Sequence, residues 1–513
     1  MQRQVVQPYN SAALSNNPAN LFAFTSPTAT QVIVQDGAIL RYATGGPWAT
    51  VATMPTATKC QAAVFNNRIY FQNGVDAPRA WDGAAAYTMG QSWNETIGSY
   101  GGAYGGNVPI AKYACAHLGR MWVAYTTESG TAYPNRVRFS HANRAEDWRQ
   151  EDFIDIDVGR DGDYITAIIE FRERLYIFKN HSISMITGYG TQNFQVVPIE
   201  QDIGCVGQNA VVNSDVGLFF FSWPQGVYLD TGRGPYPIYD KIWPSIRDDF
   251  IPAAYRGNIA LGWINKMLWA SVPWNGSSVN ARTLIYNPWI WRLRYMRFLQ
   301  GPWYPYSIGA SAFARLDQPS GPTLWLAAGA NVPYVATVEN DGNSDNWGGR
   351  VTPIQSYYTT KWYDMGQEAI HKRWRQPDIV MRAGASSNLR VDVKKNYDPS
   401  TLYKSFYIGQ TSATGTLVWN GATAQTWATI TPESWSVETG TWAAFGQQGG
   451  TWDDGSGTLG GQWAALPSTG ENIERGSFMG SARSVQMTFT GPLNTFWGVD
   501  AVTMKYIIKT VRG

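Results

Sequence analysis

One short phrase recurs along the first two thirds of the chain and limits the folds that are available to it. It begins with a turn or charged residue and continues with three apolar residues that include an aromatic ring. Successive copies begin 43 to 57 residues apart. Repeats of about 40 to 50 residues that each contain several short strands are typical of β-propeller blades. Six copies are found: Arg68–Phe71, Arg120–Val123, Arg174–Ile177, Gly217–Phe220, Lys266–Trp269 and Thr323–Leu326.

A repeat can be divided into four strands separated by turns. The best example is predicted to form strands over 164–171, 174–178, 182–188 and 194–199. Because neighbouring blades stack face to face, a large ring on the second strand would fill the space between two sheets. We therefore predict an all-β chain with a β-propeller of six or seven four-stranded blades, the seventh containing residues 30–42. The alternative is a set of unrelated antiparallel sheets in which the phrase recurs by chance.

The repeat pattern changes after residue 345, which indicates a second domain. Alternating apolar residues occur at 378–381 and 389–393, and again near the C-terminal end, as in a β-sandwich. We expect residues 1–29 to form an N-terminal arm or strand, residues 30–345 the β-propeller, and residues 346–513 a β-sandwich platform domain. Residues 409–470 are rich in Trp, Gly and Thr and are interpreted as an insertion, either short hairpins or a flap that orders against a partner.

Composition restricts the classes of partner. Charged residues make up 15% of the chain, against about 25% in typical soluble proteins, so we expect other protein chains to cover much of the surface. The net charge of +2 creates no overall field that would attract nucleic acid or an anionic membrane. Cys60, Cys115 and Cys205 form no C-x-x-C pair, which favours a reducing cytoplasm over a disulfide framework or a zinc site. No signal peptide and no apolar run of about 20 residues is visible, so no membrane-spanning segment is expected.

Residues that could carry chemistry are few. The four histidines have no metal-binding spacing, and no phosphate-binding loop or nucleophile elbow is present. We therefore predict a protein that is not an enzyme, with no catalytic, cofactor-binding or metal-binding residues and no cofactor. The one suggestive acidic cluster is the Asp155–Asp163 loop, where Asp155, Asp157, Asp161 and Asp163 alternate. It has the oxygen ligands that calcium prefers, but lacks the EF-hand glutamate, and a solvated turn explains it equally.

Two basic clusters contain interleaved aromatic residues. The first consists of Arg292, Arg294 and Arg297, and the second of Lys372, Arg373 and Arg375. Such clusters can hold phosphates and stack on bases, but they also occur on solvated strand faces and at the rims of interfaces.

Four strings of residues resemble a known family, the tail nozzle or hub proteins of short-tailed bacteriophages, which include tail tubular protein B and the packaged-DNA stabilisation proteins. They are "LGRMWVAYT…PNRVRFSHANRAEDW", "DGDYITAIIEFRERLYIFKNHSISMITG", "EQDIGCVGQNAVVNSDVGLFFFSWPQGVYLDTG" and "VTMKYIIKTVRG". The resemblance implies a homo-hexameric ring below the portal and the head-to-tail adaptor protein. Such a ring continues the DNA channel, retains packaged DNA through transient non-specific contact, and attaches tail fibre or spike proteins. It also implies location in the virion after assembly in the host bacterial cytoplasm.

Two other functions are compatible with a propeller. The first is a carbohydrate-binding module of the lectin or spike type, in which tryptophans would support sugar rings. The second is a glycosidase, which would need two carboxylates that converge on the same cleft.

Overall fold

Seven small four-stranded sheets follow one another along the first 339 residues. The computed structural model describes residues 5–8, 12–27, 29–43, 47–89, 108–157, 162–239, 242, 251–288, 303–306, 308–318, 321–328, 334–339, 344–347, 350–353, 357–383, 389–408, 472–475, 479–491 and 497–508. The first three sheets are β2 (Pro18–Thr25), β3 (Thr30–Asp36), β4 (Ile39–Ala43) and β5 (Trp48–Thr53); β6 (Gln61–Phe65), β7 (Arg68–Gln72), β8 (Arg79–Trp81) and β9 (Ala86–Thr88); and β10 (Ile110–His117), β11 (Arg120–Glu128), β12 (Thr131–Phe139) and β13 (Phe153–Asp155).

The other four sheets have the same order. They are β14 (Ile165–Phe171), β15 (Arg174–Lys179), β16 (Ile183–Thr187) and β17 (Gln195–Glu200); β18 (Val211–Asn213), β19 (Leu218–Ser222), β20 (Gly226–Asp230) and β21 (Pro235–Pro237); β22 (Ala260–Ile264), β23 (Met267–Pro273), β24 (Asn280–Tyr286) and β25 (Trp303–Tyr306); and β26 (Ala310–Gln318), β27 (Gly321–Ala328), β28 (Val335–Glu339) and β1 (Val5–Pro8). The N-terminal strand β1 thus completes the last sheet.

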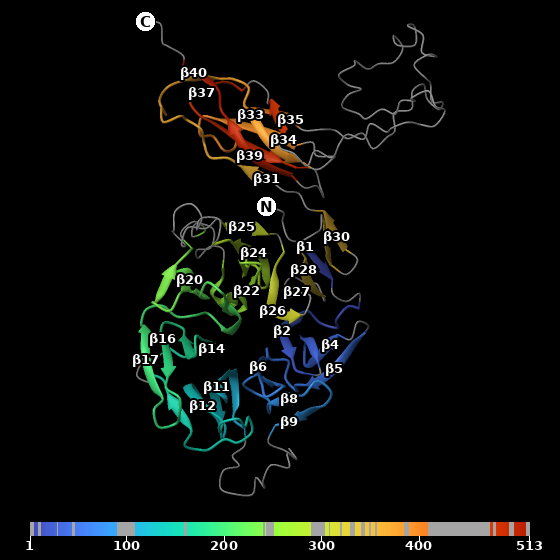
Figure 1. The fold of residues 1–513 in the computed structure, drawn as a ribbon, viewed down its shortest axis with the longest axis vertical. Coiled ribbons are helices and arrows are strands. Elements are labelled where there is room, and N and C mark those ends of the chain that lie inside the picture. The colour runs from blue at the N-terminus through green and yellow to red at the C-terminus, as the bar shows by residue number, and fades with distance from the viewer. Residues whose placement is uncertain are drawn as a thin grey trace, which may run out of the picture. The chain divides into compact units, whose positions relative to one another are not determined.

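The seven sheets are the blades of a closed β-propeller. The first strand of each blade contacts the first strand of the next, and β26 of blade 7 contacts β2 of blade 1. Figure 1 shows the resulting ring, with β2, β6 and β14 on the inside and β5, β9 and β17 on the outside. The prediction of a propeller with six or seven blades is therefore confirmed, and the number of blades is seven.

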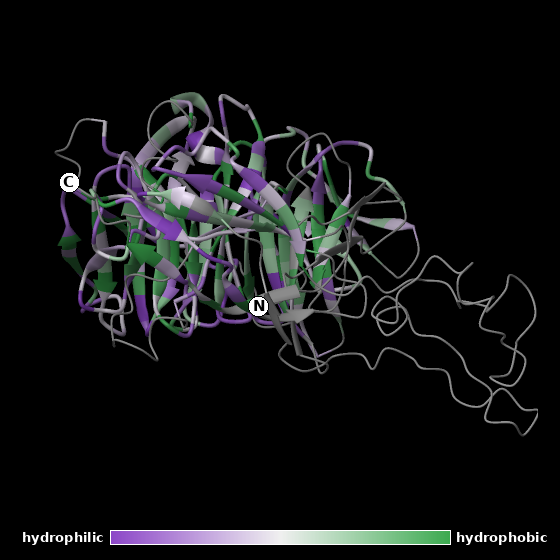
Figure 2. Ribbon diagram, turned by 90° about the horizontal axis from the view of Figure 1, so that it is seen from above, coloured by the Kyte–Doolittle hydropathy of each residue, from purple (hydrophilic) through white to green (hydrophobic). Residues whose placement is uncertain are grey.

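The repeated phrase occupies the second strand of blades 2 to 7, and residues 30–42 supply the second and third strands of blade 1. The aromatic rings of this strand are buried in blades 2 to 6, at Tyr70, Trp122, Tyr176, Phe219 and Trp269. Phe219 stacks on Trp263 of the next blade, with ring centroids 5.3 Å apart. Hydrophobic segments are visible along many of the strands in Figure 2. Packing between blades, worth about 2 to 3 kcal/mol for each buried ring, therefore explains the repeat.

The two compact units of the chain differ from the expected boundaries. The propeller unit comprises residues 6–339 and 346–350, and the second unit residues 1–5, 340–345 and 351–513. Residues 1–29 do not form a separate part, because β2 is the inner strand of blade 1 and β1 is the outer strand of blade 7. The sequence pattern did not indicate this pairing because β1 has only four residues and its partner, β28, lies at the opposite end of the propeller sequence.

The second unit is β-sandwich-like, with three small sheets. They are β31 (Tyr357–Thr359), β38 (Val485–Thr490), β34 (Leu389–Lys395) and β35 (Lys404–Ile408); β37 (Gly480–Ala482), β32 (Lys372–Trp374) and β40 (Tyr506–Ile508); and β36 (Asn472–Arg475), β33 (Asp378–Ala383) and β39 (Trp497–Thr503). They share an apolar core that includes Trp374, Ile379, Val391, Met487 and Phe489. The alternating runs at 378–381 and 389–393 lie in β33 and β34, and the insertion at 409–470 lies outside the described residues.

Candidate functional site

The axis of the propeller is occupied at one end by the connection between blades 4 and 5. This connection forms the short 3-10 helix η1 (Gln208–Ala210). The side-chain amide of Gln208 accepts a hydrogen bond from the Ile168 N–H at 2.9 Å and donates one to the Ile168 carbonyl at 2.8 Å. Because Ile168 lies on the inner strand of blade 4, η1 is attached directly to the wall of the axis.

The next residue of η1 reaches the opposite side of the ring. Asn209 donates a hydrogen bond from Nδ2 to Asn20 Oδ1 at 2.9 Å, and its Oδ1 accepts one from Gln61 Nε2 at 3.1 Å. Asn20 lies on the inner strand of blade 1, and Gln61 begins that of blade 2. We call Asn20, Gln61, Gln208 and Asn209 the axial amide cluster. It therefore joins blades 1, 2 and 4 to the start of blade 5 and bridges the propeller axis at this end.

The connections between other blades are held by the blade that precedes them. Gln35 at the end of β3 accepts a hydrogen bond from the Cys60 N–H at 2.8 Å and donates one to the Thr58 carbonyl at 2.9 Å. Two glycines in connections lie against backbone, since an added Cβ would lie 2.2 Å from the Lys179 carbonyl oxygen at Gly204 and 1.8 Å from that of Asn280 at Gly309. The blades are thus fixed to one another by specific polar contacts as well as by apolar packing.

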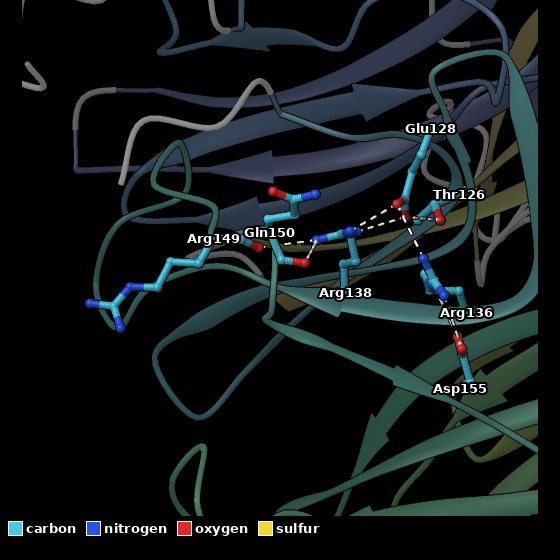
Figure 3. Close-up of polar contacts among 7 residues, drawn as sticks. All are labelled: Thr126, Glu128, Arg136, Arg138, Arg149, Gln150 and Asp155. Carbon is cyan, nitrogen blue, oxygen red and sulfur yellow. Dashed lines mark hydrogen bonds and ion pairs between the residues drawn. The ribbon is translucent and has the colours of Figure 1, made fainter. Parts of the chain in front are cut away.

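A chain of alternating charges stabilises blade 3 (Figure 3). Glu128 accepts hydrogen bonds from Arg138 Nε at 2.7 Å and Nη2 at 2.8 Å, and from Arg136 Nη1 at 3.3 Å. Arg136 also makes two hydrogen bonds to the Asp155 carboxylate, at 2.8 and 3.0 Å. The hydrogen bonds from Arg138 and Thr126 lower the pKa of Glu128 to about 2, although burial opposes this shift. All four charges are therefore compensated within the blade.

Aromatic rings and backbone carbonyls complete this network. The Arg136 guanidinium lies 4.1 Å from the centroid of the Tyr133 ring and 3.9 Å from that of Phe153. Arg138 donates from Nη1 to the carbonyls of Arg149 and Gln150 at 3.0 and 3.1 Å. The network links the long β11–β12 hairpin to β13 and the loop before it, which is a structural role.

The carboxylates at both ends of the Asp155–Asp163 loop form hydrogen bonds within the protein. Asp155 pairs with Arg136 as described, and Asp163 accepts hydrogen bonds from the His181 N–H at 2.9 Å and from Ser182 Oγ at 2.6 Å. Asp163 also lies 3.7 Å from the ammonium group of the buried Lys179. Asp161 is outside the described residues. Within the part of the chain that is described, no three His, Cys, Asp or Glu residues are arranged to hold a metal ion.

The three cysteines and His117 lie in positions that are explained by packing. Burial raises the pKa of each of the three thiols to about 12, so Cys60, Cys115 and Cys205 remain protonated and poorly nucleophilic near neutral pH. His117 is buried between blades 3 and 4, where desolvation lowers its pKa although Glu170 lies 3.4 Å away and opposes the shift.

The second basic cluster does not form one surface. Lys372 is buried and donates hydrogen bonds to backbone carbonyls, including those of Ile370 at 3.0 Å and Arg483 at 3.2 Å. Arg373 and Arg375 are exposed. Lys372 therefore stabilises the second unit and is not available to a phosphate. The first cluster, Arg292, Arg294 and Arg297, lies outside the described residues.

These observations define a β-propeller module joined to a β-sandwich-like unit. No helix in the ranges given above is both long and apolar enough to cross a membrane. No protein-family model and no curated protein matches the chain. Solved structures that resemble it include BamB from Moraxella catarrhalis, with a TM-score of 0.38, 8% identity, and coverage of 63% of this chain and 83% of that one.

A second similar structure is YCF48 from Cyanidioschyzon merolae, with a TM-score of 0.35, 8% identity, and coverage of 65% of this chain and 98% of that one. A third is the extracellular domain of BT4673 from B. thetaiotaomicron, with a TM-score of 0.37, 10% identity, and coverage of 80% and 54%. The assignment of the propeller comes from the seven sheets themselves and does not depend on these similarities.

Proposed function

We propose that this protein is a structural component of a bacteriophage tail, which forms a homo-hexameric nozzle or hub ring and performs no catalysis. In this role it continues the DNA channel below the portal and the adaptor, retains packaged DNA, and attaches fibres or spikes. It would assemble in the host bacterial cytoplasm and reside in the virion.

The observation that carries the proposal is where the family-like strings lie in the fold. The first three strings lie in blades 3 to 5, where they include β11, β12, β14 to β16 and β18 to β20, and the third also includes η1. The fourth includes the end of β39 and β40. The strings thus lie largely on strands. The third string contains Gln208 and Asn209 of the axial amide cluster, so the resemblance includes the segment that bridges the propeller axis.

The bridged axis bears on how such a ring would conduct DNA. Because the axial amide cluster crosses the propeller axis, DNA would pass through the centre of the hexamer and not through any one propeller. A closed ring needs a heterologous interface, in which one surface of each subunit complements a different surface of the next. The low content of charged residues suits a chain with two such covered surfaces.

Electron microscopy of the purified full-length protein, combined with mass photometry, tests the proposal. We expect rings with six-fold symmetry and a mass near six times 56.9 kDa. A protein that stays monomeric at micromolar concentration, and that neither an adaptor nor a fibre protein from the same genome can bind or assemble into rings, would contradict the proposal.

A further inference from the structure

The sheet β31-β38-β34-β35 of the second unit has one face in the apolar core and one face in solvent. Val391 and Phe489 point into the core, while their neighbours along each strand are partly or fully exposed. The strand register aligns the exposed residues in rows. We call this surface the outer face; it consists of Tyr357, Thr490, Arg390 and Tyr407 in one row, Thr359, Thr488, Asp392 and Ser405 in the next, and Gln486 and Lys394 beyond them.

Two tyrosines mark the ends of the first row. Tyr357 on β31 is 67% exposed and Tyr407 on β35 is 64% exposed, and both are among the most exposed large side chains described. β31 and β35 are the two edge strands of the sheet (Figure 1). The row crosses four strands, so three inter-strand spacings of about 4.8 Å place the Cα atoms of Tyr357 and Tyr407 about 14 Å apart.

The polar side chains between the tyrosines are held in place by one another. Arg390 donates from Nε to Asp392 at 2.8 Å, and Ser405 donates to the same carboxylate oxygen. The hydroxyl groups of Thr359 and Thr488 lie 3.1 Å apart, within hydrogen-bond distance. These groups are thus oriented before any ligand arrives, which reduces the entropy lost on binding.

The chemistry of the outer face favours a neutral ligand with many hydroxyls over a protein partner or a nucleic acid. No aliphatic residue is present among its described positions, whereas the centre of a protein interface is usually apolar. Arg390 and Asp392 neutralise each other, which leaves Lys394 as the one uncompensated charge on the face, too little for a nucleic-acid backbone. Exposed rings combined with hydroxyl, amide and paired charged groups suit a neutral ligand with many hydroxyls and with apolar C–H faces.

We propose that the outer face binds a neutral oligosaccharide, which lies across the strands with its ends on Tyr357 and Tyr407. The two rings would pack against the C–H faces of sugar units. Arg390, Asp392 and the threonine hydroxyls would exchange hydrogen bonds with the sugar hydroxyls between them. This site belongs to the second unit and does not depend on the formation of a ring.

The test applies full-length protein to an array of neutral oligosaccharides and to native gels that contain dextran, laminarin or mannan. The glycan that binds is then titrated by calorimetry into the wild type and into the Tyr357→Ala and Tyr407→Ala variants. We expect each substitution to weaken binding about tenfold, because each removes one stacked ring. Both side chains are largely exposed, so the melting temperature should not change.

Tyr189→Ala is the matched control, because Tyr189 is 78% exposed but belongs to the propeller unit. It should bind the glycan like the wild type. The proposal is overturned if the wild type binds no neutral glycan, or if both tyrosine variants bind as well as the wild type. It is also overturned if the glycan is lost equally from all three variants.

Discussion

At the scale of single residues, side-chain amides and ion pairs determine how this propeller is held together. Asn209 forms hydrogen bonds with Asn20, which lies 189 positions earlier in the sequence, and with Gln61. These two partners lie on the inner strands of blades 1 and 2. No local pattern marks such a residue, since an asparagine after a glutamine in a loop normally indicates only a turn. The sequence therefore could not reveal the axial amide cluster.

Replacement of Asn209 by alanine tests the axial amide cluster. Asn20 Oδ1 and Gln61 Nε2 each lose their hydrogen bond to Asn209, so unfolding in urea should require about 1 to 3 kcal/mol less free energy. Gln195→Ala is the control, because Gln195 is exposed on the outer strand of blade 4. Equal stability of the two variants would show that the cluster does not hold the blades together.

Glu128→Gln tests the charge network of blade 3. The folded-state pKa of about 2 lies below the ordinary 4.5, so the carboxylate stabilises the protein above about pH 4.5 and loses this effect as the pH falls toward 2. Since the side chain is 21% exposed, we expect the variant to lose about 2 kcal/mol at pH 7. The difference from the wild type should shrink toward zero by pH 2, as measured by thermal melts over this range.

Asp317→Asn is the control for this titration, because the Arg315–Asp317 pair is largely exposed and should contribute little. A stability difference between Glu128→Gln and the wild type that does not change with pH would contradict the assignment of the low pKa to Glu128.

At the scale of elements, the prediction from sequence succeeded where structure is local. The four strands predicted within 164–199 correspond to β14 to β17, and Arg172 and Glu173, which connect the first two, adopt the positive φ angles of a tight hairpin turn. The prediction failed at residues 1–29: β1 is short and pairs with the distant β28, and the eight-residue β2 was not recognised although its partner β3 is adjacent in the sequence. The outer face of the second unit was also not foreseen, because the alternation of β34 shows that one face is exposed but not which residues the neighbouring strands add to it.

The connections between blades provide a sharp test at this scale. Gly204→Ala would place a Cβ against the backbone of Lys179 and Asn180, which cannot move away without shifting the β15–β16 turn. We expect a loss of about 3 kcal/mol or more and a lower melting temperature. Gly257→Ala is the matched control, since this glycine also lies in a connection but has open space around its Cβ position. A Gly204→Ala protein as stable as Gly257→Ala would mean that the close approach is absent.

At the scale of the whole molecule, the last blade of the propeller is completed by one short N-terminal strand. β1 is the outer strand of blade 7, so deletion of residues 1–8 leaves that blade with three strands and the β28 edge unpaired. We expect a lower melting temperature and faster amide hydrogen exchange in β28. Deletion of residues 1–4 alone keeps β1 and should have no such effect; equal behaviour of the two deletions would argue against this closure.

The position of β1 also has a consequence for synthesis. Roughly 330 residues separate Val5 from Val335, so at about 5 to 20 residues per second the ribosome needs about 17 to 66 s to deliver the partner of the first strand. During that interval a nascent blade 1 can already stack on blade 2, but the first segment has nothing in its own chain to pair with. Crowded polysomes would then favour exchange of this segment between neighbouring nascent chains, and slower initiation should raise the yield of correctly closed monomers.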